Sequence, residues 1–223
     1  MQRHFEENLN ALKEKIIRMG SLAEEMIQKS VRALMERNPS ITQDVFDMER
    51  EVNLLHVEVD DRCVKLLALT QPMAVDLRLI AAAMKINTDL ERIADQAVNV
   101  CQTCYYHLLK ETPVPQANII PRMAEISQSM LKNSLDAFSK KDIELAKKVL
   151  LQDEEEDRLK AETLSELIEL IKREPDHSKQ FVDLILIAKN MERISDHATN
   201  IAEDVIFMVL GVDIRHHIEE KRP

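Results

Sequence analysis

The chain has 223 residues and a formal net charge of -10, with only two glycines, no tryptophan and 3% aromatic residues. This composition leaves little material for sheets and turns, whereas its abundant Leu, Ile, Met, Ala, Glu and Lys favour long amphipathic helices. The acidic charge argues against a protein that binds nucleic acid, because such binding depends on clustered Lys and Arg. We therefore expect an all-α protein that meets cations or basic partners.

Cysteine usage and hydropathy indicate the cellular compartment of the protein. The three cysteines all lie in the first half, and the opening MQRHFEENLN lacks a signal-peptide pattern. The most apolar stretches, FVDLILIA and VIFMVLGV, fall far short of the roughly 18 apolar residues that a membrane span needs. We expect a cytoplasmic, reduced protein without direct membrane insertion, which reaches a membrane only through a partner.

Proline and loop clusters divide the chain into six long helical segments. Between the third and the fourth segments, TPVPQANIIP at 112–121 breaks the chain. Short loops between long helices favour antiparallel neighbours in up-down bundles. In chain order, the predicted helices run from about Phe5 to Arg37, Ile41 to Leu69, Ala74 to Lys110, the loop at 112–121 to Ser139, Asp142 to Lys172, and REPDHS to Leu210.

An internal repeat groups these helices into two sets of three. LERIADQAVNV at 90–100 returns as MERISDHATNI at 191–201, an offset of 101 residues. A second register, with an offset of 104, pairs the first helix with the fourth (Met26 with Met130) and the second with the fifth (Val45 with Val149). The repeat predicts two pseudo-repeated antiparallel three-helix bundles, residues 1–111 and 117–216.

The repeated segment, at 90–100 and 191–201, carries polar side chains along one flank of its helix. Helical residues at i, i+4 and i+8 share a flank, and the apolar stripe of this helix lies roughly a third of a turn or more away. We therefore predict that Ile93 and Ile194 are buried, while Glu91 and Glu192 stay at least partly exposed. The residues on the two outward flanks are Glu91, Asp95 and Asn99 in the first half, and Glu192, Asp196 and Asn200 in the second.

Outward-facing acids are typical of a surface cation site and not of an internal di-iron centre. A ferritin-like centre needs inward acids and Glu-x-x-His pairs, but the one such pair here, Glu174 to His177, contains Pro175 and falls in a loop. Carboxylates and amides from two neighbouring helices offer hard oxygen ligands instead. The four candidate segments are Glu49-x-x-x-Asn53 with Glu91-x-x-x-Asp95, and Asp153-x-x-x-Asp157 with Glu192-x-x-x-Asp196.

The alternative interpretation is a solvated acidic face. In a chain that is 31% charged, one acid pair at i, i+4 carries little information, and its repulsion is weak. The placement of all four pairs at repeat-equivalent positions favours the metal site. Cys101-x-x-Cys104 has the spacing of a redox or zinc motif, but both residues fall on the apolar side of a long helix, which favours core packing.

Four motifs resemble those of one family, the PhoU phosphate-signalling regulators: ERIAD at 91–95, ERISD at 192–196, QPMAVDLR at 71–78 and GVDIRH at 211–216. The resemblance implies two similar three-helix bundles. It also implies surface clusters of transition-metal or other divalent cations (Fe, Mn, Zn or Mg), which only some members carry. Asn53 departs from the family pattern, because an acid is expected there, so the first cluster should bind more weakly. The ligand candidates implied are Glu49, Glu91, Asp95, Asp153, Asp157, Glu192 and Asp196, with Asn99 and Asn200 as weaker ones.

The resemblance further implies a non-enzymatic cytoplasmic regulator. Such proteins contact the ATPase subunit of a phosphate ABC transporter and a membrane sensor histidine kinase, and keep phosphate-starvation genes off when phosphate is plentiful. We also expect a homodimer. The alternative is a metal-dependent hydrolase or phosphoesterase that uses the carboxylate clusters, although no nucleophile has a recognisable base nearby in sequence.

Overall fold

The computed structural model describes residues 2–114 and 118–214. Three positions of the second predicted bundle, 117, 215 and 216, and with them the end of the GVDIRH motif, lie outside the described residues. The elements with described bounds are α1 (Gln2–Glu36), α2 (Pro39–Thr70), α3 (Ala74–Tyr106), η1 (Leu108–Lys110), α4 (Ile120–Lys140), α5 (Ile143–Arg173), η3 (Pro175–His177) and α6 (Ser178–Leu210).

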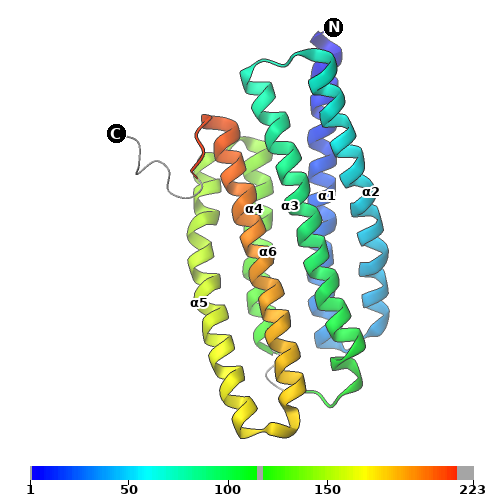
Figure 1. Ribbon diagram of the computed structural model, residues 1–223, viewed down its shortest axis with the longest axis vertical. Coiled ribbons are helices and arrows are strands. Elements are labelled where there is room, and N and C mark those ends of the chain that lie inside the picture. The colour runs from blue at the N-terminus through cyan, green and yellow to red at the C-terminus, as the bar shows by residue number, and fades with distance from the viewer. Residues whose placement is uncertain (1, 115–117, 215–223) are drawn as a thin grey trace.

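The six helices form two antiparallel three-helix bundles that stand side by side (Figure 1). Helices α1–α3 make one bundle and α4–α6 make the other, and no strand occurs within residues 2–114 and 118–214. The predicted all-α architecture of two pseudo-repeated bundles is therefore confirmed. Among the described helices, none has an apolar stretch that could span a bilayer.

The repeat extends to the residues that begin the helices. Asn38 caps α2, because its Oδ1 accepts a hydrogen bond from the Ser40 amide at 3.0 Å. Asp142, 104 positions later, caps α5 in the same way, with Oδ1 accepting from the Leu145 amide at 3.0 Å. Side-chain oxygens at this position satisfy amides that the first helical turn leaves free. Both bundles thus start their second helix by the same local chemistry.

The third helix ends four residues earlier than the sequence predicts. At His107 the backbone leaves helical geometry, with φ -121° and ψ -75°, and the chain continues into η1. The His107 Nδ1 atom lies 2.9 Å from Oδ1 of the buried Asp183 on α6. The helical pattern of the sequence continues through residues 107–110. The sequence therefore did not predict that the helix ends at His107, next to a contact with a distant helix.

Burial along α3 and α6 follows the predicted faces. Ile93 and Ile194 are both 0% exposed, whereas Glu91 and Glu192 are partly exposed. These burial predictions are confirmed. The apolar interior is continuous between the bundles, because α3 and α6 pack against each other along their length.

Polar contacts bridge α3 and α6 at successive levels. Near one end, Arg78 Nε donates to the Met208 carbonyl at 3.3 Å. Further along, Lys85 Nζ lies 3.2 Å from Oδ1 of the buried Asp204. Next, Asp89 Oδ1 lies 2.8 Å from the Nδ1 atom of His197. Partner numbers fall on α6 as they rise on α3, so the two helices run antiparallel across the contact.

Helices α1 and α4 approach closely at Gly20. A Cβ atom at this position would lie 2.4 Å from Cδ1 of Leu135, which is itself buried. We expect Gly20→Val to lower the free energy of unfolding by about 1–3 kcal/mol, because the buried Leu135 side chain must shift to admit the added atoms. Ser21→Val, at the exposed neighbouring position, is the matched control. Denaturant unfolding measures both, and equal midpoints would contradict the close approach.

Candidate functional site

The four acids of the second half gather on the outer surface between α5 and α6. Asp153 and Asp157 lie on α5, and Glu192 and Asp196 lie on α6. Partial burial, followed by the charge of Asp157 and that of Glu192, raises the pKa of Asp153. The convergence that the repeat predicts for these four residues is therefore present in the structure.

Asp196 is repelled by the other three acids. Although the residue keeps an exposed face, partial burial raises the pKa of Asp196 to about 6, and the charges of Glu192, Asp153 and Asp157 contribute to the shift. The nearby His197 opposes this effect, but its Nδ1 atom is held by Asp89. A cation placed among these carboxylates would relieve the repulsion.

A fifth carboxylate, Glu156, lies beneath this group and was missed from the sequence. Its side chain is 1% exposed, and neither carboxylate oxygen has a hydrogen-bond partner among the described residues. Burial, together with the charges of Asp153 and Asp157, raises the pKa of Glu156 to about 8. The 104-residue register assigns this position to Val52, a core residue of the first bundle. That correspondence is the sequence signal that could have revealed a buried acid.

One lysine partly neutralises the group. Lys160 on α5 forms an ion pair with Glu192, and the hydrogen bond to Glu192 raises the pKa of Lys160. We use the name second acidic cluster for Asp153, Glu156, Asp157, Glu192 and Asp196. As the side chains stand, no three His, Cys, Asp or Glu residues in the described part of the chain are arranged to hold a metal ion. Metal binding at the second acidic cluster would require side-chain rearrangement.

The first-half candidates are already paired with one another or with arginine. Asn53 Nδ2 donates to Glu49 Oε1 at 3.3 Å. Arg92 lies 3.4 Å from a carboxylate oxygen of Glu91 and 3.4 Å from one of Asp95. The repeat counterpart Arg193 is exposed, and its neighbours Glu192 and Asp196 repel each other. The first half therefore presents a more neutral surface than the second acidic cluster.

The two asparagines considered as weaker ligands do not join the acids in the structure. Asn99 Nδ2 donates to Gln96 Oε1 on its own helix at 3.5 Å. Asn200 Nδ2 donates to Asp89 Oδ1 at 3.2 Å, so this side chain turns toward α3 and the contact between the bundles. Sequence spacing places Asn200 on the same flank as Asp196, but the packing of α3 redirects it.

The three cysteines pack in the hydrophobic core. Cys63, Cys101 and Cys104 are buried and free, as core packing requires. Burial raises the pKa of Cys63 and that of Cys104 to about 12. A thiol with such a pKa is not a nucleophile at neutral pH. The interpretation of Cys101-x-x-Cys104 as packing is confirmed.

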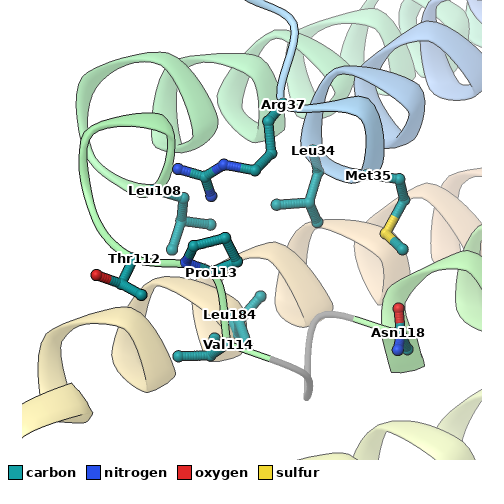
Figure 2. A pocket seen from close by; sticks show the side chains of 9 residues that line it. All are labelled: Leu34, Met35, Arg37, Leu108, Thr112, Pro113, Val114, Asn118 and Leu184. Carbon is teal, nitrogen blue, oxygen red and sulfur yellow. The ribbon is translucent and has the colours of Figure 1, made fainter.

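A small cavity of about 250 Å³ lies where α1 meets the linker between the bundles (Figure 2). Its walls are largely apolar, with Leu34, Leu108 and Leu184 directed inward. Arg37 Nη2 donates to the carbonyls of Leu109 at 3.0 Å and Glu111 at 2.6 Å. The guanidinium therefore holds the linker backbone in place against α1.

Two repeated three-helix bundles, with acids at equivalent positions of each third helix, define a class of all-α repeat proteins. A family model described as the PhoU domain matches residues 16–104 and 120–205, one segment in each half. The chain belongs to the PhoU family.

Relatives and solved structures agree with this membership. The chain is 36% identical to a "phosphate-specific transport system accessory protein PhoU homolog" from Aquifex aeolicus, with 96% of each chain covered. It is 33% identical to the protein of the same description from Pseudomonas aeruginosa, covering 97% of this chain and 89% of the relative. The crystal structure of PhoU from Pseudomonas aeruginosa superimposes with a TM-score of 0.90, covering 93% of this chain and 100% of that one at 33% identity.

A more distant structure supports the fold alone. The crystal structure of the phosphate transport system regulatory protein PhoU from Streptococcus pneumoniae superimposes with a TM-score of 0.84 at 24% identity. It covers 94% of this chain and 99% of that one. The two-bundle architecture thus persists where fewer than a quarter of the residues are identical.

Proposed function

We propose that this chain is a cytoplasmic regulator of phosphate uptake, which keeps phosphate-starvation genes off when phosphate is plentiful. Its partners are the ATPase subunit of a phosphate ABC transporter and a membrane sensor histidine kinase, and it acts as a homodimer. The similarity to transport accessory proteins over nearly the whole chain, 96% in the Aquifex aeolicus case, carries this proposal.

Deleting the gene from its own bacterium tests the regulatory role. In phosphate-rich medium we expect a reporter of phosphate-starvation genes to rise to the level of starved cells, because the repressing signal is lost. Expression of the chain from a plasmid should restore repression. Co-purification from the complemented strain then tests the two proposed partners. A reporter that stays low in the deletion strain would contradict the proposal.

A second candidate function rests on the second acidic cluster. Five carboxylates, one of them buried and without a hydrogen-bond partner, face a single paired lysine. Carboxylate oxygens are ligands for hard divalent cations, and Fe, Mn, Zn and Mg are the candidates. The cluster would hold such a cation as a structural or regulatory ligand, or as the centre of a phosphoesterase. Sustained hydrolysis of p-nitrophenyl phosphate only when Mn²⁺ is supplied would favour the enzyme.

A further inference from the structure

The first helix is longer than its repeat counterpart. With the 104-residue register, the first residue of α4, Ile120, corresponds to Ile16, whereas α1 begins at Gln2. The first 14 residues of α1 therefore have no counterpart within α4. At a rise of 1.5 Å per residue they add about 21 Å of helix. This extension makes the two bundles different at one end.

A cleft of about 860 Å³ lies between this extension, α2 and the corner that joins α2 to α3. Figure 1 shows the start of α1 beside that corner, at the top of the molecule. Along α2 the lining runs from Glu58 to Thr70, which corresponds to about 18 Å of helix. The cleft is therefore elongated along the helix axis, and its length matches about three turns of another helix.

Exposed apolar side chains lie among the charged residues that line the cleft. Leu69 is 79% exposed and Met73 is 78% exposed, the two largest values among the large hydrophobic side chains described. Phe5 of the extension and the buried Leu66 complete the apolar lining. Exposed apolar side chains gathered around a concave surface are typical of sites that another molecule covers.

Three cations line the cleft, and Arg62 is the one that forms no ion pair among the described residues, although its charge, after that of Lys15, helps to lower the pKa of Glu58. Lys15 pairs with Glu58, and Lys65 Nζ lies 2.5 Å from Asp61 Oδ2. Arg62, in contrast, donates from Nη1 to the amide oxygen of Asn8 at 3.3 Å, while its Nε–H is buried and has no acceptor within the described residues. Because Nε is buried, an incoming carboxylate would meet the Nη atoms of this guanidinium, which offer charge-assisted hydrogen bonds.

We propose that this cleft is the docking site for an amphipathic helix of a partner protein, which directs an acidic side chain to Arg62 and apolar side chains to Leu69 and Met73. The length of the cleft favours a helix over a small molecule, and a guanidinium without an ion pair among the described residues favours an acid beside it. This proposal does not depend on the transport-accessory role, because the binding test uses only the purified chain and a peptide.

Selection from a displayed library of helical peptides tests the cleft directly. The peptides are about twelve residues long, randomised on one face, and selected on the purified full chain. We expect the selected peptides to carry Glu or Asp flanked at i±3 or i±4 by Leu, Ile or Met. Arg62→Glu should weaken their binding at least about tenfold. Arg50→Glu, a charge reversal on the same helix outside the cleft, should leave it unchanged.

Charge reversal in the peptide gives a second, reciprocal measurement. A selected peptide whose acid is changed to lysine should lose binding to the natural chain and regain it with Arg62→Glu. Leu69→Ser, at an exposed position where folding is not at risk, should also weaken binding, and circular dichroism monitors the helical fold of every variant. Failure to select any peptide, selection without an acid preference, or equal binding to Arg62→Glu and Arg50→Glu would overturn the proposal.

Discussion

Replacing Glu156 with valine, the residue at the corresponding position 52, is expected to stabilise the metal-free protein. The gain in the free energy of unfolding should be about 1 kcal/mol near pH 5 and on the order of 3 kcal/mol near pH 8. Burial raises the pKa of Glu156 to about 8 from an ordinary value of 4.5, so the folded protein retains a proton that the unfolded chain releases. Urea unfolding at several pH values, with a chelator present, measures the difference.

The direction of this pH dependence follows from the raised pKa. Because the folded state binds the proton more tightly, the contribution of Glu156 to stability falls as the pH rises from about 4.5 to about 8. The variant lacks this decline, so its stability should vary less with pH than that of the natural chain. Glu154→Val, at an exposed neighbouring position, is the control and should leave the decline in place. Parallel pH profiles for Glu156→Val and the natural chain would contradict the buried carboxylate.

Asp196→Asn is expected to reduce metal uptake by at least about tenfold while leaving the helical fold intact. The residue contributes a carboxylate to the second acidic cluster and lies off the buried stripe that Ile194 occupies. The change therefore removes a negative charge without removing core packing. Purified protein loaded with Mn²⁺ or Fe²⁺ and analysed for bound metal, beside thermal unfolding, gives both quantities.

Asp95→Asn is the matched control in the first half. Arg92 already neutralises Asp95 and Glu91, and Asn53 supplies an amide where an acid would strengthen the site. The same substitution should therefore change metal content much less here. Equal metal content in the natural chain and both variants would contradict the metal site and favour the alternative, in which these acids form a solvated face. It would leave the proposed adaptor function intact, because docking to a transporter or kinase does not require a metal.

The helices and the inward faces could be predicted because both depend on local order in the sequence. Helical periodicity is repeated over many turns. The recurrence of the ERIAD motif with an offset of 101 residues was therefore enough to predict that Ile93 and Ile194 are buried, as they are. The early end of α3 occurs instead at His107, whose side chain contacts Asp183, a residue 76 positions away. Periodicity within one helix contains no information about such a contact.

The candidate site was predictable in its position but not in its charge balance. Equivalent positions in the two halves suggested two similar acid groups, yet Arg92 turns back onto its neighbours, and Lys160 reaches Glu192 from α5. These ion pairs depend on side-chain conformations, which the spacing of residues in the sequence does not determine. Burial of Glu156 likewise depends on the packing of α5, although the register with Val52 offered a hint.

The polar bridges between α3 and α6 also bear on the order in which the chain folds. They join residues that are 108 to 130 positions apart, whereas the contacts inside each bundle join helices that belong to the same half of the chain. Local contacts form faster than distant ones, because closing a long loop costs more chain entropy. During synthesis the first bundle can assemble while Lys85 and Asp89 still lack their partners on α6. Docking of α6, the last helix made, is therefore the late step, and until then the apolar face of α3 is exposed to chaperones and to neighbouring chains.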